Sequence, residues 1–178
     1  MPTKAICTIT TKSHLFKTLA LAESAHKIDS DLTFILLVVD EKKETFKDVN
    51  YKFEKIEFYD LQCIKNFSCA KGIIKKYKNQ TDRLRWSLKP ILLQFLLEKK
   101  GFDKVIYADN DIFFFNNFDF LWQDLENHAV SLTPHWYKYN PNKKQYWLEY
   151  YHRLGLYNAG FVAANRKATK VLRWWAEA

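Results

Sequence analysis

The chain has 178 residues, with 28 Lys and Arg against 20 Asp and Glu and a formal net charge of +8. Apolar residues make up 48% of it and charged residues 27%, which excludes an intrinsically disordered chain and fits one domain with a sizeable core. The four glycines form neither Gly-rich phosphate-binding motif, so Rossmann dinucleotide binding and P-loop hydrolysis lack support. The longest apolar run, Phe34 to Val39, is too short to span a bilayer.

The three cysteines form no C-x-x-C pair and give neither a zinc motif nor a disulfide framework. Their odd number fits a reducing compartment. Because a strand-like stretch follows almost directly on the N-terminus, no signal peptide is expected, and a cytoplasmic location is predicted.

Two predicted strands and a helix open the chain, and a weaker strand follows. The strands are Ala5–Thr10, Thr33–Val39 and Lys55–Tyr59. Ser13 is expected to cap the helix between the first two strands. The predicted apolar face of this helix consists of Leu15, Phe16, Leu19 and Ala22. Because Thr33–Val39 is apolar without alternation, it is expected to be buried on both faces, as in a parallel sheet covered by helices.

A long helix and a short buried strand occupy the middle of the chain. The helix is predicted from Leu84 to Lys100, with Pro90 either starting its regular part or kinking it. The strand Val105–Ala108 runs straight into an acidic turn. The remaining elements are a short helix at Phe120–Leu125, strands at Ala129–Leu132 and Gly160–Ala164, and a final helix from Lys167.

This alternation predicts an α/β fold with a mostly parallel, Rossmann-like central sheet flanked by helices. The strands 5–10, 33–39 and 105–108 are expected to be neighbouring inner strands. The whole chain, 1–178, is interpreted as a single domain. Residues 135–157 are rich in Trp, Tyr, Asn and His and are not assigned a regular structure. The aromatic part, 136–151, is expected to be mobile or partly exposed, with acceptor binding and core packing or a partner interface as open alternatives.

Charge is distributed unevenly, because no Lys or Arg occurs from Val105 to Tyr137. That stretch holds Asp109, Asp111, Asp119, Asp124 and Glu126. A basic protein with a locally negative segment suits an anionic ligand held through a metal cation. No basic helix or aromatic RNA-binding signature favours nucleic acid as a partner.

The sequence contains two Asp-x-Asp motifs, and their positions relative to the predicted strands indicate which one is the candidate for ligand binding. Asp29 and Asp31 lie where a strand is about to begin, whereas Asp109 and Asp111 lie where a buried strand finishes. Ligands of open α/β sheets bind beyond the carboxyl ends of the strands. Two carboxylates on a tight turn there can bind one divalent cation and leave coordination sites for diphosphate oxygens. We therefore expect Asp109 and Asp111 to be metal ligands.

The segment Lys104 to Ile112 reads KVIYADNDI, Trp122 follows eleven residues after the second acid, and Tyr157 to Arg166 reads YNAGFVAANR before a helix. In this order and spacing the chain resembles the GT-A fold glycosyltransferases, in particular the family 8-like group that uses nucleotide-diphospho-sugars. The resemblance spans nearly the whole chain. In that family the domain continues beyond the N-A-G helix, so this chain is expected to lack a C-terminal segment that completes the metal shell.

The resemblance implies roles for individual residues. Asp109 matches the acid that contacts metal and nucleotide ribose, with Asn110 beside it, and Asp111 matches the main metal ligand. Lys89 matches a basic residue that approaches the donor, and Asn158 matches the amide that faces the donor sugar. The turn after the first strand matches the place that holds uracil and ribose, which implies donor contacts for Thr10, Thr11 and Ser13. His135 falls near the position where many relatives have an acid that contacts the sugar.

The resemblance implies a glycosyltransferase of hexosyltransferase type in polysaccharide biosynthesis. It would use Mn²⁺ or Mg²⁺ and a nucleotide sugar, in particular a UDP-sugar, and would act on a carbohydrate or glycolipid acceptor. Basic patches suit peripheral contact with an anionic membrane surface. Two alternatives are a module that binds a nucleotide sugar or glycan without turnover, and a sugar nucleotidyltransferase. The second needs a Gly- and Arg-rich N-terminal loop, which Thr8 to Ser13 does not provide.

Overall fold

The computed structural model describes residues 3–46, 55–135, 153 and 155–178. Its strands are β1 (Lys4–Thr10), β2 (Thr33–Val38), β3 (Ile56–Asp60), β4 (Lys104–Ala108), β5 (Val130–Pro134) and β6 (Tyr157–Asn165). Its helices are α1 (Leu15–His26), α2 (Leu61–Ile64), α3 (Ala70–Lys76), α4 (Thr81–Glu98), α5 (Asp119–Asn127) and α7 (Thr169–Glu177). Short 3₁₀ turns cover Lys12–His14, Lys43–Phe46 and Arg166–Ala168.

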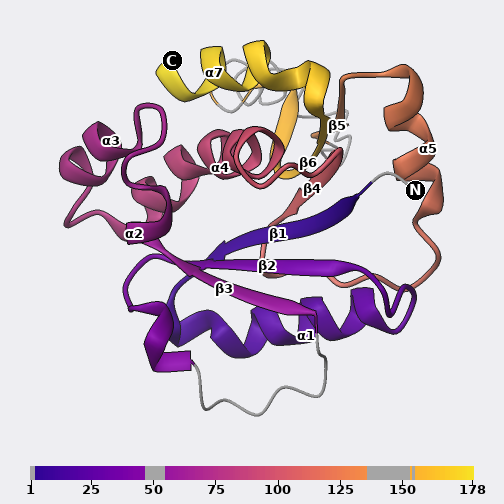
Figure 1. Ribbon diagram of the computed structural model, residues 1–178, viewed down its shortest axis with the longest axis horizontal. Helices are drawn as coiled ribbons and strands as arrows, with labels where there is room; N and C mark the ends of the chain where they lie inside the picture. The colour runs from indigo at the N-terminus through magenta and orange to yellow at the C-terminus, as the bar shows by residue number, and fades with distance from the viewer. Residues whose placement is uncertain (1–2, 47–54, 136–152, 154) are drawn as a thin grey trace, which may run out of the picture.

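The strands form one six-stranded sheet in the order β3-β2-β1-β4-β6-β5 (Figure 1). β1 pairs in parallel with both β2 and β4, and β2 pairs in parallel with β3. β6 runs antiparallel to both β4 and β5. The prediction of a mostly parallel α/β sheet with three neighbouring inner strands is therefore confirmed. The carboxyl ends of β1, β2, β3 and β4 all lie at the same edge.

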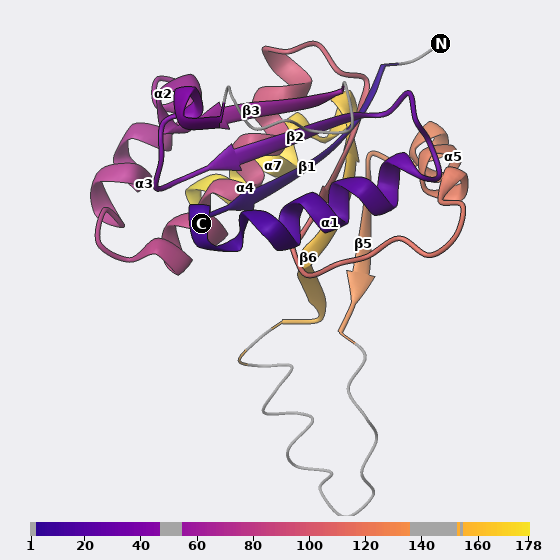
Figure 2. The same ribbon diagram turned by 90° about the horizontal axis from the view of Figure 1, so that it is seen from below.

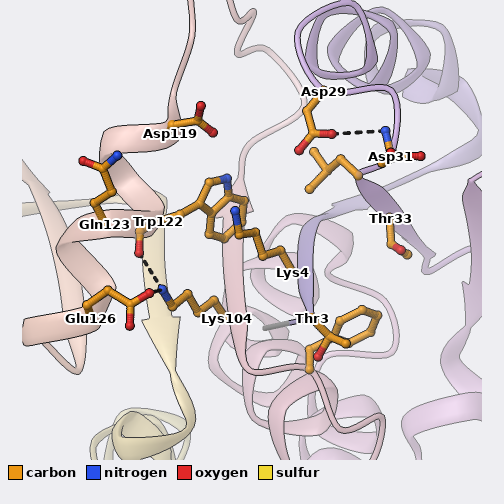
Figure 3. A pocket seen from close by; sticks show the side chains of 12 residues that line it. Thr3, Lys4, Asp29, Asp31, Thr33, Lys104, Asp119, Trp122, Gln123 and Glu126 are labelled. Atoms are coloured by element: carbon orange, nitrogen blue, oxygen red, sulfur yellow. Dashed lines mark hydrogen bonds and ion pairs between the residues drawn. The ribbon is translucent and has the colours of Figure 1, made fainter. Parts of the chain in front are cut away.

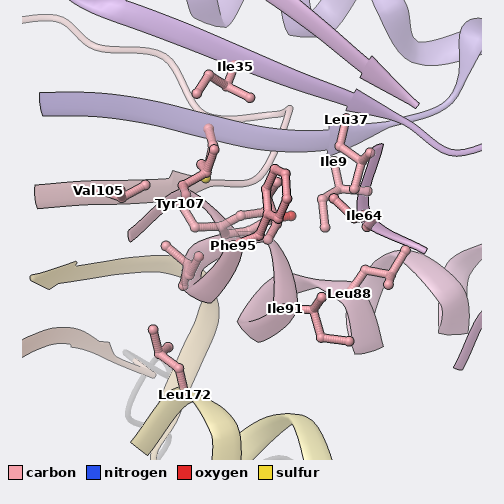
Figure 4. Close-up of a cluster of buried hydrophobic side chains, with 14 of the residues drawn as sticks. Ile9, Ile35, Leu37, Ile64, Leu88, Ile91, Phe95, Val105, Tyr107 and Leu172 are labelled. Atoms are coloured by element: carbon pink, nitrogen blue, oxygen red, sulfur yellow. The ribbon is translucent and has the colours of Figure 1, made fainter. Parts of the chain in front are cut away.

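Helices cover both faces of the sheet (Figures 1 and 2). The sheet therefore separates the core into two clusters, one on each face. Alternate residues of β1 point to opposite faces, as the pleat of a strand requires. Cys7 and Ile9 pack with Leu88 and Leu92 of α4 and with α7, in the cluster drawn in Figure 4. Ile6 packs in the second cluster with α1 and α5. No helix in the described ranges is long and apolar enough to cross a bilayer.

Three details of the predicted helices are wrong. Ser13 does not cap α1, because a 3₁₀ turn over Lys12–His14 precedes that helix. Phe16 is 67% exposed, because the face that α1 buries contains the predicted Ala22 together with Thr18, Leu21 and Ala25. Of the two roles predicted for Pro90, starting the helix is wrong, because α4 begins at Thr81 and has the proline in its interior. The predicted aromatic segment 136–151 lies outside the described residues.

Candidate functional site

The candidate site is built at the carboxyl edge of the sheet, where the chain turns immediately after β4. The turn is closed by the Ile112 N–H, which donates to the Asp109 carbonyl over 3.1 Å. Asn110 is buried, and its side-chain N–H₂ donates to the Thr10 hydroxyl at the end of β1 over 3.3 Å. The Thr18 hydroxyl of α1 donates to the same Thr10 oxygen over 2.9 Å. These hydrogen bonds connect the turn after β4 to the end of β1 and to α1, next to Asp109 and Asp111.

Asp109 is fixed by groups from three elements. The Tyr107 hydroxyl donates to Asp109 Oδ1 over 2.7 Å, and Lys89 Nζ of α4 lies 2.9 Å from Oδ1 and 3.1 Å from Oδ2. The backbone N–H of Asp109 donates to the Gly160 carbonyl over 2.7 Å. Its side chain is 32% exposed, whereas that of Lys89 is 6% exposed. A nearly buried ammonium needs such a charged partner to offset its lost hydration.

Tyr107 completes this cluster, and we did not single it out from the sequence. Residues two apart in a strand point to the same face, so Tyr107 and Asp109 share one side of β4. Lys89 Nζ lies 4.9 Å from the centre of the Tyr107 ring. Burial, followed by the negative charge of Asp109, raises the pKa of Tyr107 well above its ordinary value. The phenol therefore stays protonated and remains a donor to Asp109.

β6 forms the other wall of the cluster. Lys89 Nζ donates to the Ala159 carbonyl over 3.1 Å, and the Gly160 N–H donates to Asn158 Oδ1 over 2.7 Å. A Cβ atom on Gly160 would lie 2.7 Å from Asp109 Oδ2 and 2.9 Å from Asn158 Oδ1. Both distances are shorter than real Cβ contacts. A glycine is therefore needed at position 160, because any side chain there would clash with both Asp109 and Asn158.

Asp111 differs from Asp109, because its side chain is exposed and has no hydrogen-bond or ion-pair partner among the described residues. Carboxylate oxygens are the ligands that Mg²⁺ and Mn²⁺ prefer. The carboxylate of Asp111 is open to such an ion, whereas the oxygens of Asp109 already contact Tyr107 and Lys89, and metal binding by the two acids remains a prediction. In the described part of the chain, no three His, Cys, Asp or Glu side chains are grouped closely enough to hold a metal by themselves.

The remaining predicted residues, Thr10, Thr11, Ser13 and His135, follow or end strands at the same edge of the sheet. Thr10 is fully buried, so its hydroxyl holds the turn. The Thr11 hydroxyl lies 3.0 Å from Ser13 Oγ and 2.8 Å from His14 Nδ1. His135 follows β5, and its N–H donates to the Leu156 carbonyl over 3.0 Å, next to the start of β6. Their contacts with a donor remain predictions.

A mostly parallel sheet with an acidic turn at the carboxyl edge of its central strand, faced by an antiparallel N-A-G strand, defines a glycosyltransferase fold of the GT-A type. The family model of glycosyl transferase family 8 matches residues 5–171. The chain belongs to that family.

Two curated proteins are similar to this chain over almost its whole length. The uncharacterized proteins YfnF and YfnD of Bacillus subtilis (strain 168) are each 26% identical to this chain, over 186 and 182 residues. The alignments cover 98% and 99% of this chain, which spans only 57% and 55% of those two proteins.

Among solved structures, mouse xyloside xylosyltransferase 1 in its apo form has a TM-score of 0.57 and 14% identity, covering 99% of this chain and 74% of that one. The galactosyltransferase LgtC, in complex with donor and acceptor sugar analogues, has a TM-score of 0.59 and 14% identity, covering 98% and 60%. GlyE of Streptococcus pneumoniae TIGR4 has a TM-score of 0.58 and 16% identity, covering 97% and 36%. At these identities the likeness concerns the fold.

Proposed function

We propose that this chain is the donor-binding part of a metal-dependent glycosyltransferase. It moves a monosaccharide from a UDP-sugar to a carbohydrate or glycolipid acceptor. The observation that carries this proposal is the pairing of a fixed acid with an open one. Asp109 is held by Lys89 and Tyr107, whereas Asp111, two residues on, is exposed and has no partner in the described part of the chain. Family membership supports the same reaction class.

Asp109 and Asp111 would hold Mn²⁺ or Mg²⁺, which when bound neutralises the charge of the departing diphosphate. Lys89 places a second positive charge beside Asp109, in an almost buried setting where its field is weakly screened. The side chains of Asn158 and Asp109 both approach Gly160, so the Asn158 amide would be available near the acid for contact with the donor sugar. Positively charged surface would favour peripheral contact with an anionic membrane.

The first test is calorimetric titration of UDP into the protein with and without Mn²⁺. Asp111→Asn keeps the size of the side chain and removes the charge that attracts the cation. We expect metal-dependent UDP affinity to fall about tenfold or more, where one decade corresponds to about 1.4 kcal/mol. Asp31→Asn, in the Asp-x-Asp motif at the opposite edge, is the control and should leave UDP affinity unchanged. Equal losses in both variants, or none in Asp111→Asn, would refute the assignment of the site.

A second measurement separates turnover from binding alone. Transferases slowly pass their sugar to water, so a panel of UDP-sugars should include one that the wild-type protein hydrolyses in the presence of Mn²⁺. Asp111→Asn should abolish that hydrolysis. A protein that binds UDP-sugar with Mn²⁺ but hydrolyses none of the panel, even with glycan acceptors added, would be a binding module.

A further inference from the structure

A large cavity lined by both polar and apolar residues lies at the edge of the sheet opposite to Asp109 (Figure 3). Its volume is about 720 Å³, which is within the range of small-molecule binding sites. Lys4, Thr33 and Lys104, the first residues of β1, β2 and β4, line it. The loop before β2 forms one wall and α5 forms the other. The proposed donor site uses none of these residues.

Trp122 of α5 lines this cavity and carries a polar atom without a partner. The residue is 2% exposed, and its indole N–H has no hydrogen-bond acceptor in the part of the chain that the structure describes. Figure 3 shows the ring nitrogen turned toward the gap between Asp29 and Asp119. A buried N–H without an acceptor costs free energy, and few occur in folded proteins. The position is therefore suited to an acceptor atom supplied by a ligand.

Two carboxylates on the walls of the cavity, those of Asp29 and Asp119, provide hydrogen-bond acceptors, whereas the Trp122 indole is a donor. Asp29 accepts the Asp31 N–H on Oδ1 over 3.1 Å, and Asp119 accepts the Asn117 amide on Oδ2 over 2.9 Å. The second oxygen of each carboxylate has no partner among the described residues. These oxygens can accept hydrogen bonds, so the cavity presents acceptors beside the indole donor.

Lysines at the base of the cavity add positive charge. Lys104 Nζ donates to the Trp122 carbonyl over 2.7 Å and pairs with Glu126. Lys4 Nζ lies 5.6 Å from the centre of the Trp122 ring, and no carboxylate within residues 3–46, 55–135 or 155–178 pairs with it. The cavity thus contains charges of both signs and hydrogen-bonding groups of both kinds.

We propose that this cavity binds a carbohydrate, at a site separate from the donor site. Adjacent sugar hydroxyls can donate to Asp29 and Asp119 while one of their oxygens accepts from the Trp122 indole. A metal cation or an amine would leave that N–H without an acceptor and would meet the Lys4 ammonium. An inorganic anion would face the carboxylates of both walls. A neutral polyhydroxylated ligand satisfies every group without a net charge conflict.

The experiment observes the tryptophan indole N–H signals of ¹⁵N-labelled protein by NMR. The probes are the methyl glycosides of galactose, glucose, xylose and N-acetylglucosamine, together with lactose and cellobiose. The Trp122 signal is the one missing from the spectrum of Trp122→Phe. We expect at least one probe to shift this signal downfield in a saturable manner. Asp29→Asn and Asp119→Asn should weaken that binding about tenfold. Asp124→Asn, an exposed acid of α5 outside the cavity lining, should not.

Absence of any saturable shift in the Trp122 signal with all six sugars would overturn the proposal. So would a shift produced by Mg²⁺, putrescine or inorganic phosphate but not by sugar, or an equal loss in Asp124→Asn. If Trp122→Phe does not fold, saturation-transfer measurements on the sugars with the two Asp variants decide the same question. Asp111→Asn should leave this binding unchanged while UDP binding is lost. Failure of the donor site and failure of this one are therefore distinguished.

Discussion

Asp109 is oriented before any ligand arrives, because Tyr107, Lys89 and the Gly160 carbonyl contact it from three elements. Preorganisation of this kind lowers the free energy needed to order a site on binding. It also assigns different tasks to the two acids of the motif. Asp109 has a fixed direction, whereas Asp111 is exposed and has no hydrogen-bond or ion-pair partner in the described part of the chain.

Tyr107→Phe tests whether the phenol positions Asp109. Loss of one hydrogen bond to a carboxylate should lower Mn²⁺-dependent UDP affinity about threefold to tenfold, which corresponds to about 1 kcal/mol. Calorimetry measures this change. Tyr59→Phe is a matched control, since the Tyr59 hydroxyl also donates to a carboxylate, Glu57, over 3.0 Å, on β3. An equal effect of both variants on UDP affinity would contradict a positioning role.

Gly160→Ala places a methyl group 2.7 Å from Asp109 Oδ2. Either the acid moves or β6 shifts, so we expect a loss of stability of about 1–3 kcal/mol together with weaker UDP binding. Urea unfolding and calorimetry measure the two effects. Gly72→Ala is the control, because nothing lies within 4 Å of its Cβ position inside α3. That substitution should stabilise the protein by about 0.5–1 kcal/mol. A loss of stability in Gly72→Ala would contradict the claim that the effect of Gly160→Ala comes from the clash at its Cβ position.

At the level of single elements, α2 depends on one buried cap. Asp60 Oδ1 accepts the N–H groups of Gln62 and Cys63 over 2.8 and 3.2 Å, and Oδ2 accepts that of Lys43 over 3.1 Å. Burial alone would raise the pKa of Asp60, but these hydrogen bonds outweigh it and lower the pKa.

Because the folded-state pKa of Asp60 is lowered, ionised Asp60 stabilises the protein at pH values above the ordinary Asp pKa of about 3.9. That contribution is lost as the pH falls through the lowered value. Asp60→Asn should therefore be less stable at neutral pH and should show a shallower loss of unfolding free energy below about pH 4. Urea unfolding across this pH range checks the prediction. Parallel curves for wild type and variant would contradict it.

The elements that the sequence predicted correctly are those with a strong local signal. Unbroken apolar runs located β1, β2 and β4, and helical periodicity located α4. The short helices α2 and α3 were not predicted, because four and seven residues are too few to show a helical period. The buried face of α1 was predicted only in part: Ala22 is buried as expected, but Leu21 and Ala25 were missed and Phe16 is exposed.

The site was predictable only in part for a related reason. The place of Asp109 and Asp111 follows from chain order and from the rule for parallel sheets. The contacts of Asp109 with Lys89 and Gly160 join residues that are far apart in the sequence. The periods of helices and strands relate only near neighbours, so they cannot predict such contacts. Tyr107 had a usable signal, because residues two apart on a strand share a face.

In the whole molecule, the apolar core lies on the two faces of the sheet. The candidate donor site and the cavity lie at the carboxyl and amino ends of its parallel strands. One apolar cluster packs under α4 and α7 and the other under α1 and α5. The carboxyl edge holds Asp109 and Asp111, and the amino edge holds the cavity with Trp122. A rigid sheet between them keeps the two places apart, so substitutions at one are expected to leave the other unchanged.

The position of β1 in the sheet also governs how the chain can fold during its synthesis. β1 is made first but lies between β2 and β4, and Lys4 pairs with Lys104. A nascent chain that has left the ribosome only as far as β2 therefore exposes one apolar strand edge, which stays unpaired until β4 emerges. Pairings of such long range are slow to form, and unpaired edges favour aggregation. We therefore expect the nascent chain to be prone to aggregation between the synthesis of β2 and that of β4. A chaperone that binds the unpaired edge of β1 during this time would protect the chain.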